Sequence, residues 1–364
     1  MQTSSASMKP SLLQFVLLVV NVLSYSSVLS ISLSSFYVSH PAANLSVYDD
    51  TSTDSNSEES AFQKFREDFS RSYEPGSAEF SIRFKTFKKS IGRHVYLNSF
   101  SRSSSNNSAK YGVTEFSDLS PDEFRERYLG GRHVQLPKYT KLKEDTLNIP
   151  LAPKFDWREK NVVTPVQSQQ SCGGCWAFSV VGGIESVYAI QGNALEELSV
   201  QQVIDCSYKN QGCNGGSTVG ALSWLNQTQE KIVKTSEYPF KALTGVCHFF
   251  PKSAFGVSIK GYEAYDFSGQ EEKMMEKLVQ WGPLVVTVDA VSWQDYLGGV
   301  IQHHCSSQEA NHAVLITGFD RTGEVPYWIV RNSWGTSWGN EGYVYIEIGG
   351  NICGIADSVS AAFV

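Results

Sequence analysis

The stretch Ser171-Cys172-Gly173-Gly174-Cys175-Trp176-Ala177-Phe178-Ser179 joins an irregular Gly-rich segment to a long apolar run. Apolar residues then recur at spacings of 4, 4 and 3, which predicts one face of an α-helix: Trp176, Val180, Ile184 and Val187. Gln191-Gly192 is expected to end this helix. Cys175 is therefore expected at or just before the helix N-terminus, where the helix dipole is expected to lower the pKa of its thiol. Because the thiolate is the nucleophilic form, this position indicates a reactive cysteine.

The Cys-x-x-Cys pattern by itself leaves other interpretations open. Cys172 and Cys175 could form half of a zinc site, a thioredoxin-like redox pair or two ordinary disulfide cysteines. The chain has 7 cysteines, and all of them follow residue 170. In an oxidising compartment an odd number leaves one thiol over, either for an intermolecular link or for chemistry. The start of the helix favours Cys175 as the odd cysteine.

The N-terminus, residues 1–24, is predicted to be a secretory signal. Lys9 precedes an apolar run from Leu12 to Leu23, and small residues follow the run. The run has about 12 residues, whereas a spanning helix needs about 20, so no stable membrane span is expected. Secretory entry predicts delivery to the lysosome or release outside the cell. It also makes three Asn-x-Ser/Thr sequons candidate glycosylation sites: Asn44, Asn106 and Asn226.

Charge is distributed unevenly along the chain. Residues 1–150 carry 17 Lys and Arg against 16 Asp and Glu, whereas residues 151–364 carry 13 against 21. A nucleic-acid-binding protein would need a basic face, so the acidic second region argues against that class.

Composition divides the chain after the signal into four parts. Residues 25–58 are Ser-rich and polar, which is typical of a flexible spacer. Residues 59–131 contain two helical stripes of phenylalanine and a helix opened by Ser120-Pro121-Asp122-Glu123, a capping box with proline at the first helical position. Gly130-Gly131 is expected to end that helix. Residues 132–150 form a Lys-rich linker that a protease could reach, and residues 151–364 hold all the cysteines.

The region 151–364 has a helical half followed by a β-rich half. A capping box at Ser199-Val-Gln-Gln202 opens a helix that ends near Cys206, and Ser268 with Glu271 is expected to cap a later helix towards Trp281. Four strands are predicted after it, over 284–288, 312–318, 327–331 and 342–348. The order predicts an α+β fold with a cleft between its two halves.

A nucleophilic thiolate needs an imidazole partner, and the imidazole needs an acceptor that orients it. His312 opens a predicted strand, and Asn332 ends the next one. Another arrangement is a zinc site made by His303-His304-Cys305 with Cys172 and Cys175. This zinc site would fit no standard ligand spacing and would leave the other cysteines without partners.

At these residues the chain resembles the papain-like cysteine proteases, over residues 60–364. Four motifs of that family occur in order: Gln169-Gln-Ser-Cys-Gly-Gly-Cys175-Trp, the Gly-Cys-Asn-Gly-Gly turn at 212–216, Asn311-His312-Ala313-Val314, and Arg331-Asn332-Ser333-Trp334-Gly335. Cys175 precedes His312 by 137 residues and Asn332 by 157, which is close to papain-type separations. Gly174, where most members have Ser, and Gln170, where most have Gly, indicate one branch of the family.

The resemblance implies a papain-like two-domain fold, with a helical left half and a β-rich right half, preceded by a mainly helical pro-segment. It also implies the catalytic roles. Cys175 attacks the peptide carbonyl, His312 holds the thiolate as its imidazolium partner, and Asn332 orients the imidazole. Gln169 and the Cys175 N–H form the oxyanion hole. Trp334 is expected to shield the bond between His312 and Asn332 from water.

Further features follow from the same resemblance. It implies three disulfides: Cys172–Cys213, Cys206–Cys247 and Cys305–Cys353. Residues 59–131 resemble the inhibitory pro-domain, whose helical Glu-Arg-Phe-Asn-Ile-Asn signature is met by four of six residues: Glu79, Arg83, Phe87 and Asn98. Ser90 and His94 replace the other two members. The pocket for the second substrate side chain would be lined by five residues: Ser217, Thr218, Thr287, Ala313 and Ser358.

The implied function is a lysosomal-type cysteine endopeptidase that needs no cofactor and no metal. Only 33 residues separate Cys213 from Cys247, which leaves no room for the occluding loop of carboxydipeptidase members. Protein and peptide substrates, the chain's own pro-segment and cystatin-like inhibitors are the expected partners. The alternative is a papain-fold binding protein with weak catalysis, against which the complete set of catalytic residues argues.

Overall fold

A computed structural model describes residues 55–100, 107–130, 139–142, 149–248, 255–307 and 309–364. The predicted signal, most of the predicted spacer, Asn44 and Asn106 lie outside these ranges. Residues Ser55–Val364 form one compact unit. No helix in the described ranges is both long enough and apolar enough to cross a bilayer.

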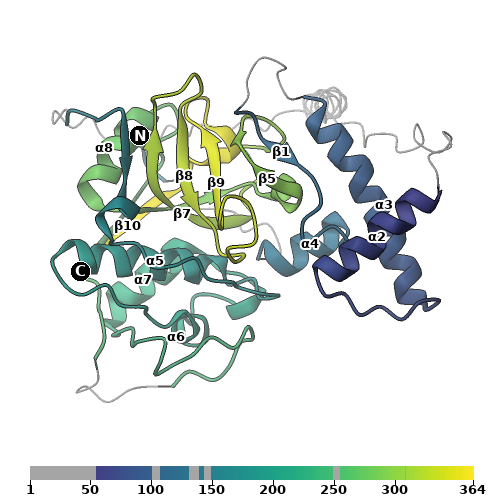
Figure 1. The fold of residues 1–364 in the computed structure, drawn as a ribbon. Coiled ribbons are helices and arrows are strands. Elements are labelled where there is room, and N and C mark those ends of the chain that lie inside the picture. Colours follow the sequence, from purple (N-terminus) through teal and green to yellow (C-terminus); the bar gives the residue numbers. More distant parts are fainter. Residues whose placement is uncertain (1–54, 101–106, 131–138, 143–148, 249–254, 308) are drawn as a thin grey trace, which may run out of the picture. The chain divides into compact units, whose positions relative to one another are not determined.

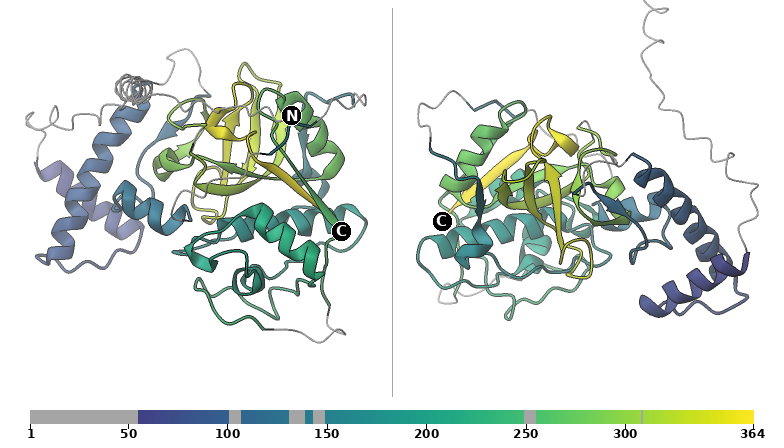
Figure 2. Two further views of the ribbon diagram at one scale, coloured as in Figure 1. Left: turned by 180° about the vertical axis from the view of Figure 1, so that it is seen from behind. Right: turned by 45° about the horizontal axis from the view of Figure 1, so that its top comes forward.

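The central helix of the catalytic region is α5 (Cys175–Ile190), and it starts at the predicted cysteine. It is buried on nearly all sides, because it lies between the β-sheet and the helices α6 (Val200–Cys206) and α7 (Thr218–Thr228). Figures 1 and 2 show these three helices on one side of the strands. The predicted stripe is therefore only part of a helix that is apolar around its circumference.

The β-rich half is one sheet of eight strands within the described residues, with order β3-β10-β4-β7-β8-β9-β6 and with β2 also paired to β7. Its strands are β2 (Lys154–Asp156), β3 (Gly261–Tyr265), β4 (Leu284–Val288), β6 (Val300–Ile301), β7 (His312–Asp320), β8 (Tyr327–Arg331), β9 (Tyr343–Glu347) and β10 (Val359–Phe363). Most neighbours are antiparallel, and β6 with β9 is parallel. The α8 helix (Glu271–Trp281) packs near β7, and short 3-10 turns occupy 157–160, 212–214, 291–295 and 352–354.

Alternate residues of the central strands face the helical half. Val285 of β4 and Leu315 of β7 belong to the core around α5, whereas Val286 and Val314 belong to the core of the β-rich half. This period of two follows from the pleat of the strands. It places the side chains of Thr287 and Ala313, which are register partners, on the face towards α5.

The pro-region consists of α2 (Ser55–Asp68), α3 (Ala78–Asn98), β1 (Lys110–Tyr111) and α4 (Pro121–Tyr128). The α2 helix begins inside the predicted spacer. It packs on α3 through a small core of three fully buried rings: Phe62, Phe65 and Phe87. The predicted capping box of α4 is confirmed, with Ser120 and Glu123 each accepting a backbone N–H of the other.

Of two further predicted caps, the one at α8 is wrong and the one at α6 is confirmed in part. The α8 helix is preceded by Gln270 and has no side-chain cap, because Gly269 at φ +73° turns the chain between Ser268 and the helix. At α6, Ser199 accepts from the N–H of Gln202 at 2.9 Å, but the reciprocal bond is missing. The Ser199 N–H instead donates to Val233 O at 2.8 Å.

Short strands were missed for a physical reason. Strand β10 contains small residues, and β3 is partly exposed along its whole length, so neither has a clear apolar alternation. Their strand form is set by partners across the sheet rather than by local sequence.

Candidate active site

Cys175 is the first residue of α5, and Gly174 before it offers no side chain to cap the helix. The helix N-terminus is therefore left to the thiol. Backbone N–H groups of Cys175, Trp176 and Ala313 interact with the sulfur in a way that favours the thiolate. Because Ala313 follows His312 at the start of β7, this contact brings the first turn of α5 to the first residue of that strand.

His312 is held by Asn332 from the end of β8. Its Nε2 lies 2.7 Å from Asn332 Oδ1, and both side chains are buried. The Trp334 ring lies 4.7 Å from the imidazole, centroid to centroid, and Trp293 approaches edge-on at 6.0 Å. These rings keep water from the bond to Asn332. His312 Nδ1 is buried and makes no hydrogen bond among the described residues, so it is the nitrogen free to serve the thiol.

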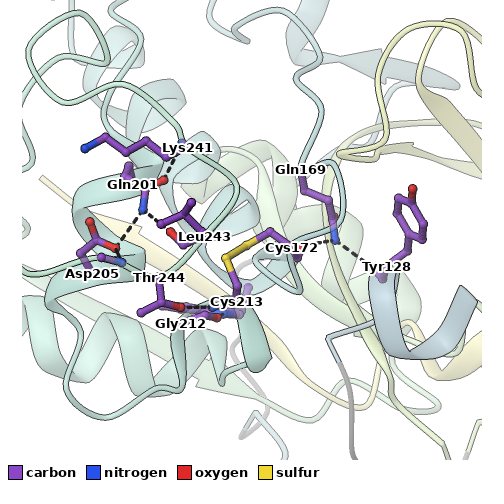
Figure 3. The surroundings of a disulfide bond; sticks show 12 residues. Tyr128, Gln169, Cys172, Gln201, Asp205, Gly212, Cys213, Lys241, Leu243 and Thr244 are labelled. Atoms are coloured by element: carbon purple, nitrogen blue, oxygen red, sulfur yellow. Dashed lines mark hydrogen bonds between the residues drawn. A yellow bond between two sulfur atoms is a disulfide. The ribbon is translucent and has the colours of Figure 1, made fainter. Parts of the chain in front are cut away.

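The side chain of Gln169 is fixed in position by its amide oxygen, Oε1, which accepts a hydrogen bond from Ser333 Oγ at 2.6 Å. Its Nε2 donates to Cys172 O at 2.9 Å and to the carbonyl of Tyr128 in the pro-region, also at 2.9 Å. Figure 3 shows both bonds fanning out from the Gln169 amide. A peptide carbonyl of the pro-region therefore occupies the side-chain donor of the predicted oxyanion hole.

Gly130 of the pro-region packs against the thiol of Cys175. A Cβ built on Gly130 would stand 3.5 Å from Cys175 Sγ and 3.4 Å from Gly173 O. Its φ is +71°, a conformation that glycine adopts without steric cost. The Gly130 predicted as a helix terminator is thus also the residue that lets the backbone of the pro-region pass over the thiol.

Covering the site reverses the expected pKa shift of the thiol. Burial raises the pKa of Cys175 to about 11, and this effect outweighs the backbone N–H groups that favour the thiolate. Burial likewise lowers the pKa of His312 to about 4, against the favourable bond to Asn332. The prediction of a depressed thiol pKa is therefore wrong for this covered state, in which both groups are neutral.

All seven cysteines lie in the described ranges, and six form the three implied disulfides, Cys172–Cys213, Cys206–Cys247 and Cys305–Cys353. Cys175 is the free thiol. The first disulfide ties the loop before α5 to the Gly-rich turn, where Gly173 N–H donates to Cys213 O at 2.8 Å. Thr244 Oγ1 accepts from the Cys213 N–H at 2.8 Å, as Figure 3 shows.

The disulfides also remove the zinc alternative. Cys172 and Cys305 are oxidised to different partners, so neither is available as a thiolate ligand. In the described ranges no group of three His, Cys, Asp or Glu residues is arranged to hold a metal.

Two of the five predicted pocket residues lie together on the sheet face towards α5, and a third, Ser358, immediately precedes β10. Thr287 and Ala313 are register partners, and the Thr287 N–H donates to Ser358 O at 3.3 Å. The Thr287 hydroxyl is buried and has no hydrogen-bond partner in the part of the chain that the structure describes. The phenol of Tyr139, from the linker, is largely buried beside Ser358.

The other two predicted pocket residues begin α7. Ser217 is its N-cap and accepts from the Gly220 N–H at 3.1 Å. Thr218 is the first helical residue and is buried. Asn226, the sequon within the described ranges, lies on the same helix and is partly exposed.

Sequence reasoning missed the residues that cover the site. Tyr128 acts through its carbonyl, which any residue could supply, so no sequence signal exists for it. Asp295 is fully buried and paired with two residues of α3, although 202 positions separate it from Arg93. Ser333 was part of a quoted motif, and its role in holding Gln169 became visible only in three dimensions.

The catalytic region and the pro-region each match a known protein family. Residues 151–363 match the family described as papain family cysteine protease, and residues 62–124 match the cathepsin propeptide inhibitor domain (I29). Cathepsin O of Homo sapiens is 63% identical over 279 residues, which span 76% of this chain and 87% of that protein. Cathepsin O of Mus musculus is 60% identical over 278 residues, which span 76% and 88%.

Solved structures of related precursors share the fold. The digestive procathepsin L2 proteinase of Tenebrio molitor superposes with a TM-score of 0.75 at 29% identity, over 84% of this chain and 100% of that one. The recombinant stem bromelain precursor gives a TM-score of 0.70 at 30% identity, over 85% and 99%. With one matching domain over the catalytic region and an inhibitor domain before it, this chain belongs to the papain family of cysteine proteases and is a cysteine endopeptidase made as a zymogen.

Proposed function

We propose that Cys175, His312, Asn332 and Gln169 carry out peptide-bond hydrolysis by acyl transfer. The observation that supports this assignment is the carbonyl of Tyr128 bound at 2.9 Å by the Gln169 amide, next to the backbone that covers Cys175. A substrate carbonyl held by the same donor would lie beside the thiol. Donors placed there stabilise the negative charge that develops on oxygen in the transition state.

The proposed reaction has two halves. In the first, the Cys175 thiolate forms a bond to the carbonyl carbon, and His312 Nδ1 gives its proton to the departing amine as the C–N bond breaks. In the second, water attacks the acyl carbon, His312 takes a proton from it, and the C–S bond breaks to release the acid. Asn332 Oδ1 holds Nε2, which leaves Nδ1 for the proton transfers in both halves.

The ion pair that this chemistry requires forms only when the site is open. In the covered state the pKa of Cys175 is about 11 and that of His312 is about 4, so proton transfer from thiol to imidazole is unfavourable. Once the backbone at Gly130 has left, water solvates the thiolate and the imidazolium, and the two opposite charges also stabilise each other. The helix N-terminus of α5 then acts in the direction that the sequence predicted.

Residues 59–131 are proposed to inhibit residues 151–364 until the linker is cut. Proteins delivered through the secretory pathway to the lysosome, or met outside the cell, are the proposed substrates, and cystatin-like proteins are proposed inhibitors. The predicted signal and the sequons Asn44, Asn106 and Asn226 support this route.

The test uses processed protein and a peptide carrying a thiol-reactive epoxide. One label per molecule on Cys175, with loss of cleavage of a peptide library, is expected. The matched control is Cys175→Ser, which should take no label and cleave nothing. Cleavage by that variant at one tenth of the normal rate would contradict the assignment and favour a binding protein with adventitious activity.

A further inference from the structure

The pro-region and the catalytic region share a buried charge cluster away from the nucleophile. Asp295 ends the 3-10 turn at 291–295, and its side chain is 1% exposed. Its carboxylate accepts from Arg93 Nε at 2.5 Å and Nη2 at 2.8 Å, and it lies 2.9 Å from His94 Nε2. Both partners come from α3 of the pro-region. The guanidinium therefore binds the carboxylate through two parallel bonds, the geometry that gives the strongest such pairs.

The two departures from the pro-domain signature both serve this carboxylate. His94, which replaces the isoleucine of the signature, contacts Asp295 directly. Ser90, which replaces the asparagine, accepts from Arg93 Nη2 at 3.0 Å and so orients the guanidinium. An apolar residue at position 94 would leave a buried carboxylate short of one partner. The substitutions are thus matched to a residue 201 positions away from His94.

The contacts around the cluster have a different character. Strand β1 pairs with β5 (Tyr296–Gly298) beside it, as Figure 1 shows, and Thr114 Oγ1 donates to Gln294 O at 2.6 Å. Gln294 Nε2 donates to the carbonyls of Phe116 and Leu119 at 2.9 and 2.8 Å. The two Gln294 Nε2 bonds use backbone carbonyls, which every pro-segment possesses, whereas Thr114 contributes its hydroxyl. These contacts can supply affinity, whereas the bonds to Asp295 depend on the particular side chains of Arg93 and His94.

Burying a carboxylate without a pairing charge or hydrogen bond costs free energy. A pro-segment that does not pair with Asp295 should therefore bind less tightly. The pKa of Asp295 is lowered, because burial, which raises it, is outweighed by the bonds from His94 and Arg93. Tyr111 of β1 faces the same carboxylate, whose charge adds to burial in raising the pKa of that phenol. The titratable side chains next to Asp295 are therefore those of Arg93, His94 and Tyr111.

We infer that Asp295 is a recognition socket through which this protease selects its own pro-segment. The partner that fits it is a helix presenting an adjacent Arg–His pair, from this chain or from a second copy. This proposal adds specificity to the proposed inhibition by the pro-region, and it rests on that inhibition. Pro-segments with an apolar residue in place of His94 are rejected because they leave Asp295 buried and underpaired.

The experiment uses the full zymogen with a specific protease site placed within residues 143–148. Cutting that site leaves the pro-segment and the enzyme as a non-covalent complex, and dilution then gives its Kd from the return of peptidase activity. Arg93→Met and His94→Ile are made in the zymogen. Both changes lie outside the mature enzyme, so its kcat/KM is the same in every case. The matched control is Lys88→Met on the same helix, which removes a surface ion pair to Glu58 of α2 and a cation–π contact with Phe84 of α3.

Arg93→Met is expected to raise Kd at least about 30-fold and His94→Ile at least about tenfold, whereas Lys88→Met changes it less than about twofold. In Asp295→Asn the effect of Arg93→Met should shrink at least about fivefold, because the paired charge is gone. Equal Kd values for wild type, Arg93→Met and His94→Ile would overturn the socket, as would strict additivity with Asp295→Asn. A cut wild-type complex that is fully active at every concentration would refute the inhibition itself, and the socket with it.

Discussion

Gly130→Val is expected to expose the thiol of Cys175 while the linker remains intact. Gly130 has φ +71°, which a β-branched residue adopts only with strain. The added side chain would also meet Cys175 Sγ at 3.5 Å and Gly173 O at 3.4 Å. A left-handed conformation costs about 1–2 kcal/mol for a residue with a Cβ. The population in which the pro-region has lifted off the site should therefore rise about 5- to 30-fold.

The starting rate follows from the buried thiol. Burial raises the pKa of Cys175 from 9.0 to about 11, so the closed zymogen holds about 100-fold less thiolate at neutral pH than an ordinary cysteine. That difference corresponds to about 2.7 kcal/mol. Since thiolate is the form that reacts with iodoacetamide, alkylation of the wild-type zymogen should be slow and should still rise with pH at about pH 9.

The assay is the rate of carbamidomethyl transfer to Cys175, measured by mass spectrometry between about pH 6 and pH 10. The other six cysteines are in disulfides, so the label reports one site. The matched control is Gly192→Val, also at a positive φ (+90°) but with nothing within 4 Å of the added Cβ. It should show the ordinary strain of such a change without faster labelling.

Two results would refute this reasoning. A wild-type rate that levels off below about pH 8 would mean that the covered thiol titrates like an exposed one or lower. Equal labelling of Gly130→Val and wild type would mean that the backbone at this position does not control access to the sulfur.

Three further outcomes are expected. His312→Ala and Cys175→Ser act on the same chemical step, so the double variant should be no slower than the slower single variant; a multiplied loss of kcat would contradict their pairing. The pKa of Glu123 is lowered because its bonds from Ser120 and Arg83 outweigh burial, so its stabilising effect is complete above about pH 4.5 and lost below it. The fall in zymogen melting temperature below about pH 4.5 should therefore be smaller in Glu123→Gln than in wild type, with Asp295, whose pKa is also lowered, contributing to the fall that remains; an equal fall in both proteins would exclude Glu123. Ser217→Tyr with Thr218→Pro should raise kcat/KM for Phe- or Leu-containing peptides by narrowing the pocket, at about fourfold per buried methylene; equal values for both proteins would show that these positions do not set it.

The Ser217→Tyr change carries a cost that the sequence did not reveal. Ser217 caps α7, and loss of such a cap costs about 1 kcal/mol. Thr218, by contrast, is the first helical residue, where proline is well tolerated. Thr218→Pro alone is therefore the cleaner control for the pocket, because it leaves the cap in place.

Local sequence predicted those parts of the fold that local sequence determines. The start of α5 and the capping box of α4 depend on residues within a few positions, and both were found where they were predicted. The full burial of α5 was not predicted, because it depends on the sheet and the helices that pack against both sides of it. A Cβ at Gly182, for example, would meet Arg331 Nη1 at 2.5 Å, so this glycine is required by a strand far along the chain.

The residues of the proposed site could be named from the sequence, but the protonation state of its thiol could not. Motifs identified Cys175, His312, Asn332 and Gln169, and the geometry brings the last three into hydrogen-bonded pairs with partners at 2.6–2.9 Å. The pKa of the thiol could not be predicted, because it depends on whether the pro-region lies over it. A helix dipole seen in the sequence favours the thiolate, but burial favours the neutral thiol and is the larger effect here.

That ordering of effects explains why the pro-region can place a peptide carbonyl on a catalytic donor without being cut there. The bond from Gln169 to Tyr128 O would polarise the carbonyl, yet attack requires a thiolate as well as a polarised carbonyl. The same stretch of backbone lies against Cys175 at Gly130, and in this covered state burial keeps both Cys175 and His312 neutral. Inhibition and deactivation of the nucleophile are thus one event. A zymogen whose pro-region is displaced should gain access and reactivity together, with no separate rearrangement of α5.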